Sequence, residues 1–120
     1  MKQEIREHFS EAVALKQAGE LERAKRMLLK LGEDDPDSPA ILAVLGDVCW
    51  EMKLLEEAVC AFTRAVELAP KLEAASLGLF HCLWELGRQE QASDEIRRFM
   101  SVSDSEDYRR IIKEINEKSA

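Results

Sequence analysis

Apolar residues recur at three- and four-residue intervals along most of the chain, which is the spacing of one helix face. The pattern is strongest in residues 39–70. Its first half carries apolar or small residues at Leu42, Leu45, Gly46 and Cys49. Its second half has the same spacing at Leu55, Ala58, Val59, Phe62, Ala65 and Val66. The pattern predicts two antiparallel helices in a hairpin, which the small side chains of Gly46 and Ala58 allow to pack closely.

The hairpin pattern recurs with a period of 34 residues. The alanine of its second helix is found at Ala24, Ala58 and Ala92. The turn between its helices holds Gly19, Lys53 and Gly87. Glycine in this turn favours the end of a helix, because its backbone readily adopts a positive φ. The sequence therefore predicts three tandem repeats, at about residues 5–38, 39–72 and 73–106.

Helix–turn–helix units of this period resemble the tetratricopeptide repeat. The resemblance implies an all-α helical-hairpin solenoid of seven helices, with residues 1–120 forming a single domain. We expect the last helix, at about residues 105–118, to cover the apolar flank of the third repeat. Its apolar face carries Tyr108, Ile111, Ile112 and Ile115. The alternative is that this helix serves self-association.

The terminal repeats depart from the middle one. In the third repeat Phe80 occupies the position of Gly46, so its ring is expected to widen the third hairpin or tilt its helices. In the first repeat His8 and Glu11 replace apolar residues, which is typical of an end repeat with one solvated side.

Local signals predict where individual helices begin and end. Ser38 followed by Pro39 predicts the start of a helix. Gly32 predicts the end of the preceding helix. The capping-box spacing from Ser103 to Glu106 predicts the start of the last helix.

The charge balance excludes some classes of partner. The net charge is −7, whereas nucleic acids and anionic membranes call for a basic surface, so we expect neither as a partner. The arginine pairs 97–98 and 109–110 are expected to form ion pairs within their helices. The N-terminus lacks a signal-like apolar stretch, and no apolar run approaches the roughly 20 residues of a spanning helix.

The cysteines point to a reducing compartment. Cys49, Cys60 and Cys82 are odd in number and lack paired metal-binding spacing. We expect reduced thiols that pack as small apolar groups, which suits a cytoplasmic location.

No motif of catalysis or cofactor binding is found. The sequence lacks a glycine-rich phosphate loop, a nucleophile elbow and a zinc-type histidine pair. His81 and Cys82 are adjacent on a predicted helix, so their side chains point about 100° apart. His81 could instead form an ion pair with Glu85, four residues on. We therefore expect no enzyme activity, no catalytic residue, no cofactor and no metal site.

The resemblance implies that the first helix of each hairpin lines a partner-binding groove. In this sequence the predicted groove residues are Phe9, Val13, Asp47, Trp50, Leu77, His81 and Trp84. Trp50 and Trp84 are equivalent in the repeat and are the two tryptophans of the chain. They either contact a partner or pack between neighbouring helices, since an indole can do both.

The best-known groove of this family is a basic, asparagine-lined clamp that holds the acidic C-terminus of chaperones. In register, its positions fall on Phe9, Val13, Val44, Ala74 and Gly78. None of these side chains donates a hydrogen bond or carries positive charge, so no such clamp is expected. The resemblance implies a protein- or peptide-binding adaptor. The alternatives are a structural module that forms a homo-oligomer and a dedicated small secretion-type chaperone.

Overall fold

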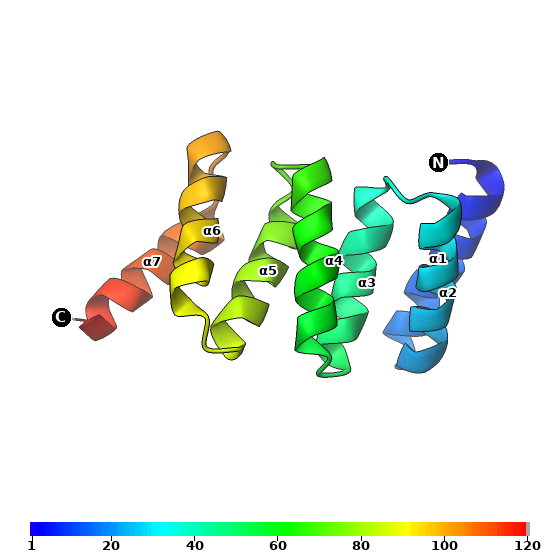
Figure 1. Ribbon diagram of the computed structural model, residues 1–120, viewed down its shortest axis with the longest axis horizontal. Coiled ribbons are helices and arrows are strands. Elements are labelled where there is room, and N and C mark those ends of the chain that lie inside the picture. The colour runs from blue at the N-terminus through cyan, green and yellow to red at the C-terminus, as the bar shows by residue number, and fades with distance from the viewer. Residues whose placement is uncertain (120) are drawn as a thin grey trace.

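The computed structural model describes residues 1–119, which form seven α-helices and no strand (Figure 1). The helices are α1 (Gln3–Gln17), α2 (Leu21–Asp34), α3 (Pro39–Glu51), α4 (Leu55–Leu68), α5 (Glu73–Glu85), α6 (Gln89–Val102) and α7 (Glu106–Ser119). Three hairpins follow one another along a molecule of 51 × 27 × 20 Å, and α7 lies at its end. The predicted all-α solenoid is confirmed.

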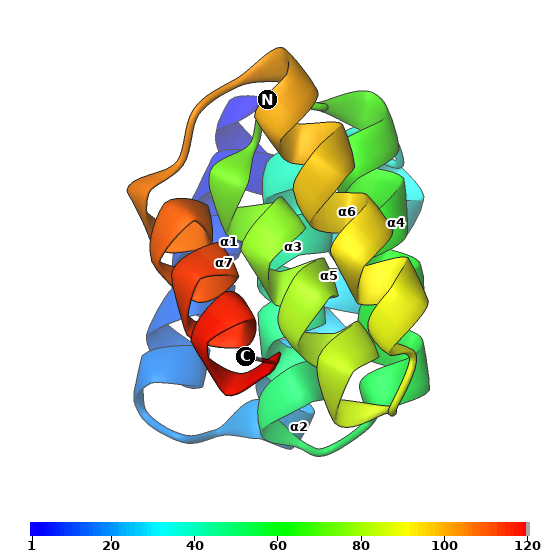
Figure 2. The ribbon, with the colours of Figure 1, turned by 90° about the vertical axis from the view of Figure 1, so that its left-hand side faces the viewer.

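The helices are arranged in two layers (Figures 1 and 2). One layer holds α1, α3, α5 and α7, and the other holds α2, α4 and α6. The first helices of successive hairpins contact one another, α1 with α3 and α3 with α5. They also pack on the second helix of the preceding hairpin, as α3 does on α2 and α5 on α4. We call the surface of α1, α3, α5 and α7 the first-helix face.

The turns within the three hairpins share one geometry. The residues that follow the first helix have positive φ, at Gly19 (+82°), Lys53 (+64°) and Gly87 (+79°). In the middle turn Leu54 donates its backbone N–H to Cys49 over 2.8 Å. The 34-residue equivalence of these turns is thus confirmed. Lys53 alone among them carries a Cβ in a conformation that favours glycine.

One phenyl ring joins the second hairpin to the third. Phe62 of α4 is 1% exposed and lies between two glycines. A Cβ added to Gly46 of α3 would come within 2.6 Å of the ring, and one on Gly78 of α5 within 2.4 Å. Both glycines are therefore required by the close approach of the ring. The sequence indicated this role for Gly46 but not for Gly78.

The third hairpin is packed differently. Phe80 occupies the position of Gly46, and Ile96 replaces the phenyl ring of the middle hairpin. The Phe80 ring lies 5.9 Å from the ring of Tyr108 in α7, which also packs on Phe99 at 5.6 Å. The predicted widening or tilt of the third hairpin by Phe80 stays a prediction.

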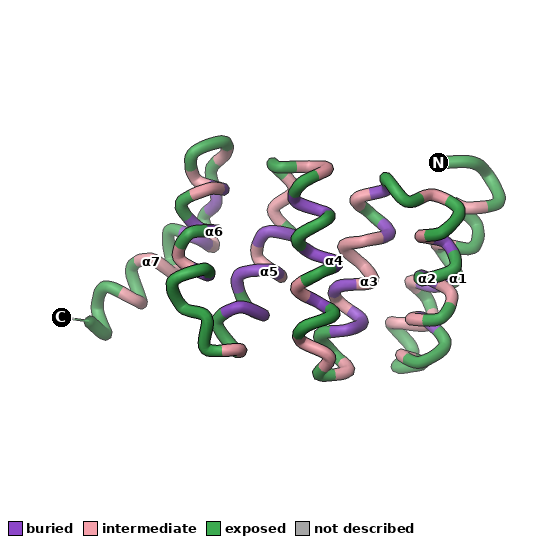
Figure 3. Tube along the Cα trace, viewed as in Figure 1, coloured by how far each residue is buried: buried purple, intermediate pink, exposed green. Residues whose placement is uncertain are grey.

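Buried residues gather between the two layers, in two clusters (Figure 3). The smaller cluster belongs to α1, α2 and one side of α3, and it includes Leu28 and Ile41. The larger cluster runs from α3 to α7 and includes Phe62 and Tyr108. Leu45 is partly buried and packs against both clusters.

Helix α2 ends later than the sequence suggested. The predicted end at Gly32 is wrong, because the helix continues to Asp34. Leu31, only 4% exposed, anchors the last turn in the core, and its carbonyl accepts the N–H of Asp35 at 2.8 Å. Glycine permits the end of a helix but does not enforce it.

Side-chain caps open two of the helices. Ser38 caps α3 as predicted, since its Oγ accepts the backbone N–H of Ile41 at 3.3 Å. The predicted capping box of Ser103 is wrong, because the Oγ of Ser105 accepts the N–H of Tyr108 at 3.1 Å. The burial of Tyr108 sets where α7 begins, and Ser105 is then the residue in capping position.

The three cysteines are free, and two of them are buried. Burial raises the pKa of Cys82 to about 11 and also raises the pKa of Cys49, so both thiols stay protonated at neutral pH. Cys60 is exposed, contrary to the expectation that all three pack as apolar groups. It lies on the outer side of α4, where the apolar stripe does not reach.

Candidate functional site

The predicted groove residues all lie on the first helices of the hairpins. Helix α1 carries Phe9 and Val13, α3 carries Asp47 and Trp50, and α5 carries Leu77, His81 and Trp84. The two tryptophans and His81 are exposed, and the other four are half-buried. Phe9 packs against the smaller core cluster and Leu77 against the larger one, so both act mainly in packing.

The two tryptophans are equally exposed but have different neighbours. Each is 37% exposed. The indole N–H of Trp50 donates to Glu85 Oε2 at 3.0 Å, which links α3 to α5. The indole of Trp84 lies 5.7 Å from the ring of Phe80 on its own helix. Each ring thus packs on one side and leaves another side open for contact.

The predicted ion pair of His81 with Glu85 does not form in the structure. The Glu85 carboxylate instead accepts the indole N–H of Trp50, which the neighbouring hairpin brings within hydrogen-bond distance. The prediction considered only residues on the same helix. In the structure Glu85 bonds to Trp50 of the preceding hairpin instead.

The middle of the first-helix face is acidic. Lys16 of α1 forms an ion pair with Glu51 of α3 over 3.6 Å. Burial raises the pKa of the nearby Asp47 carboxyl, Glu51 adds to this rise, and Lys16 opposes it. Asp47 and Glu51 thus stand near Lys16, and Glu85 of α5 lies beside Trp50 on the same face.

A cavity of about 370 Å³ lies between α5 and α7. Its lining consists of Phe80, His81, Trp84, Gln89, Ile111, Glu114, Ile115, Lys118 and Ser119. The volume falls in the usual range for a binding pocket, and aromatic and branched apolar side chains line much of it. Glu114 and Lys118 add one charge of each sign.

The structure therefore brings together two of the predicted groove residues, Trp84 and His81, with a wall from α7. The sequence did not predict Phe80, Ile111 or Ile115 as part of a site. The apolar stripe of α7 was a visible signal, but it was interpreted as the cover of the third repeat or, alternatively, as a surface for self-association.

A buried polar network holds α7 in place. The hydroxyl of Tyr108, fully buried, lies 2.7 Å from Ser76 Oγ, which donates to Glu95 at 2.6 Å. Arg98 donates to Glu95 through Nε at 2.8 Å and Nη2 at 2.6 Å, and to the carbonyl of Pro70 at 3.0 Å. Burial raises the pKa of Tyr108 far above its usual range, so the phenol stays neutral. The cavity wall contributed by α7 is thus fixed.

Other kinds of site were sought in the described part of the chain. Among residues 1–119, no group of three histidine, cysteine, aspartate or glutamate side chains could hold a metal ion. None of the helices described is both long and apolar enough to cross a membrane.

A family model described as tetratricopeptide repeat matches residues 39–72. This segment is therefore similar to a tetratricopeptide repeat. The matched residues are those of the middle repeat expected from the 34-residue period. The seven helices fit three such repeats and a capping helix.

Solved structures share this repeat fold. The chain superposes on the first TPR of Spaghetti (RPAP3), bound to the HSP90 peptide SRMEEVD, with a TM-score of 0.86 and 15% identity over 98% of this chain and 94% of that one. The type III secretion translocator chaperone SycD of Yersinia enterocolitica superposes with a TM-score of 0.81 and 14% identity, over 98% of this chain and 89% of that one. MamA of Desulfovibrio magneticus RS-1 superposes with a TM-score of 0.76 and 18% identity, over 84% of this chain and 57% of that one. A comparison with curated proteins gave no match.

Proposed function

We propose that this protein is an adaptor that binds a protein or peptide segment on its first-helix face. The observation that carries the proposal is the position of Trp84, which is 37% exposed and lines the cavity between α5 and α7. Trp50 offers a second, equally exposed indole one repeat earlier. Tryptophans of this kind are frequent binding hot spots.

The chemistry of the face suggests which segments fit. The cavity accepts an apolar or aromatic side chain, and the neighbouring carboxyl groups of Asp47, Glu51 and Glu85 favour a basic residue beside it. An acidic chaperone C-terminus, such as the peptide bound by the first TPR of Spaghetti, lacks this match. The clamp positions of this chain hold apolar side chains or glycine, at Phe9, Val13, Val44, Ala74 and Gly78.

The remaining expectations belong to the same proposal. We propose a binding protein without catalysis, which acts in the cytoplasm on protein rather than on nucleic acid or membrane. The net charge of −7 supports this, as do the arginines at 97, 98, 109 and 110. Their partners lie on the same helices or beside them, in the pairs Arg97–Asp94, Arg98–Glu95, Arg109–Asp104 and Arg110–Asp107. Self-association and a dedicated secretion-type chaperone stay as alternatives, and the mass in solution separates the first from the others.

The test begins with peptides selected from a displayed library on the purified protein. We expect Trp84→Ala to weaken the selected peptides about tenfold or more, a loss of about 1.4 kcal/mol. The matched control is Leu29→Ala, because Leu29 is 48% exposed and belongs to α2 in the other layer. Normal binding by Trp84→Ala, or equal loss in both variants, contradicts the proposal.

The indoles themselves report where a peptide binds. In Trp50→Phe the remaining emission comes from Trp84, and in Trp84→Phe it comes from Trp50. We expect a selected peptide to shift the emission of Trp84 to shorter wavelength, because its ring loses contact with water. Saturating peptide that changes neither emission would place the binding site elsewhere.

A further inference from the structure

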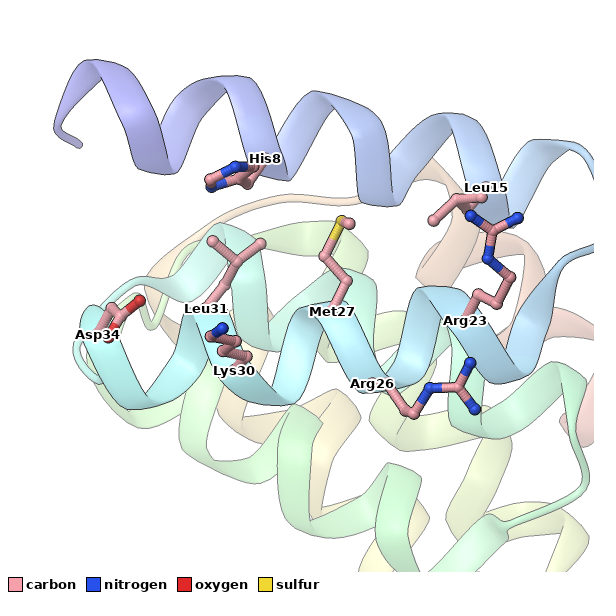
Figure 4. A pocket seen from close by; sticks show the side chains of 8 residues that line it. All are labelled: His8, Leu15, Arg23, Arg26, Met27, Lys30, Leu31 and Asp34. Carbon is pink, nitrogen blue, oxygen red and sulfur yellow. The ribbon is translucent and has the colours of Figure 1, made fainter.

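The first hairpin carries a groove of its own, separate from the first-helix face. It lies between α1 and α2, has a volume of about 430 Å³, and has the following hairpins behind it (Figure 4). Met27 of α2 projects toward α1 between His8 and Leu15, and Leu31, which is 4% exposed, lies one turn further along α2. His8 and Asp34 stand near one end.

Three cations of α2 line this groove, although the chain as a whole is acidic. Arg23, Arg26 and Lys30 are spaced so that they share one side of the helix. Arg23 reaches Glu20 at 3.9 Å, a long and exposed ion pair. Arg26 and Lys30 form no ion pair with any residue in the described part of the chain.

This lack of partners is local to the groove. Lys25, on the same helix but turned toward α4, forms an ion pair with Glu57 over 2.7 Å, which raises its pKa. The acidic residues of α1, Glu4, Glu7 and Glu11, are exposed and do not line the groove. The groove therefore combines an apolar floor with a rim along α2 that carries three cations and Asp34, and two of these cations, Arg26 and Lys30, form no ion pair among the described residues.

We propose that this groove binds an amphipathic helix of a partner protein, with its apolar face on Leu15, Met27 and Leu31 and an acidic edge along α2. Helices cover the equivalent flanks inside the array, since α3 packs on α2 and α5 on α4. A helix is thus the shape that a hairpin flank of this fold accepts. The charge of Arg23, Arg26 and Lys30 selects an acidic edge over a basic one. The groove shares α1 with the first-helix face, but none of its lining residues lines the cavity between α5 and α7.

Two synthetic helical peptides test the proposal with the full chain. Both carry leucines on one face and glutamines on one edge, and the other edge carries glutamates in one peptide and lysines in the second. We expect the glutamate peptide to bind more tightly. The double variant Arg26→Glu/Lys30→Glu should weaken that peptide about tenfold or more and strengthen the lysine peptide.

The control is Lys71→Glu/Lys113→Glu, which makes the same change of charge at exposed positions outside the groove. It should leave the binding of both peptides unchanged. Equal binding of the two peptides, or an equal loss in the control, would overturn the proposal. A second copy of this chain is the other possible occupant of the groove, and sedimentation of the wild type and of each variant tests it. A wild-type dimer that becomes monomeric in Arg26→Glu/Lys30→Glu would show that a second copy binds in the groove, and would overturn the proposal.

Discussion

The two sides of α5 are joined to their neighbours by different means. Toward α4, the ring of Phe62 is enclosed by Gly46 and Gly78, and shape alone fixes the spacing of the helices. Toward α7, the contact is made by the rings of Phe80 and Tyr108 and by buried hydrogen bonds. Close packing around glycine leaves no space, whereas large side chains and polar contacts hold a helix further away. The cavity lined by Trp84 is found on the second side.

The two tryptophans show what this difference does to equivalent residues. Trp50 faces a neighbour, α5, that comes close enough for Glu85 to accept its N–H. Trp84 faces α7, which stands further off and leaves a cavity lined by Ile111 and Ile115. At the same repeat position, Trp50 therefore forms a hydrogen bond to the next hairpin, whereas Trp84 forms part of a cavity wall.

The largest effect is expected when α7, the neighbour of α5 on its second side, is removed altogether. A chain that ends at Asp104 loses Tyr108 and three isoleucines and uncovers Phe99, which is now 1% exposed. Since each large apolar side chain contributes about 1.5–3 kcal/mol when buried, we expect aggregation or a large fall in melting temperature. Light scattering and thermal unfolding measure this. Removal of residues 117–120 alone, which leaves that apolar face intact, is the control. A monomeric, equally stable chain would mean that α7 does not cover the third repeat.

The glycine side is tested by Gly78→Ala. The added Cβ would lie 2.4 Å from the Phe62 ring, so the ring or α5 has to move, at a cost of about 1–3 kcal/mol. Gly32→Ala is the matched control, because nothing lies within 4 Å of its Cβ position and alanine favours helix there. Urea unfolding should thus show a lower free energy of unfolding for Gly78→Ala and a higher one for Gly32→Ala. Equal effects would mean that the ring is not confined.

The polar side is tested by Tyr108→Phe. This keeps the ring contacts and removes the hydroxyl that lies 2.7 Å from Ser76 Oγ. We expect a loss of about 0.5–1.5 kcal/mol, with faster amide hydrogen exchange confined to α7. Ser101→Ala serves as control, since its hydroxyl is bonded on an exposed surface. Unchanged exchange in α7 would show that the apolar contacts alone position this helix.

The smallest effect is expected in a turn. Lys53 has a φ of +64°, whereas the equivalent residues of the other two turns are glycines. Lys53→Gly should stabilise the protein by about 0.5–1 kcal/mol, because it relieves the clash of the Cβ in this conformation. Lys71→Gly, at a turn position without positive φ, should not stabilise. A less stable Lys53→Gly would mean that its side chain makes contacts that outweigh the strain.

Structural features that recur in each repeat or follow from local residue types were predictable from the sequence. Features that depend on a single tertiary contact were not. The turns at Gly19 and Gly87 and the cap at Ser38 follow from local chemistry. The C-terminal end of α2 and the cap at Ser105 were missed, because they depend on the burial of Leu31 and Tyr108.

The candidate site could be predicted only in part. The repeat register placed Trp84 and His81 on the correct helix, since they belong to one periodic element. The wall from α7 depends on how far that helix stands from α5. It also involves Ser76 and Glu95, which form a buried hydrogen-bond network with Tyr108 of α7, and no periodic pattern reveals the burial of these two polar residues.

The division of the core into two clusters has a consequence for how the protein opens. The smaller cluster joins the first hairpin to one side of α3 through Ile41 and Val48, whereas the larger one runs from α3 to α7. Leu45 packs against both clusters. We expect the first hairpin to open at a lower free energy than global unfolding, with Ile41 and Val48 exposed and the larger cluster still folded. Occupation of its groove by a helix would raise this local free energy and leave that of the larger unit unchanged.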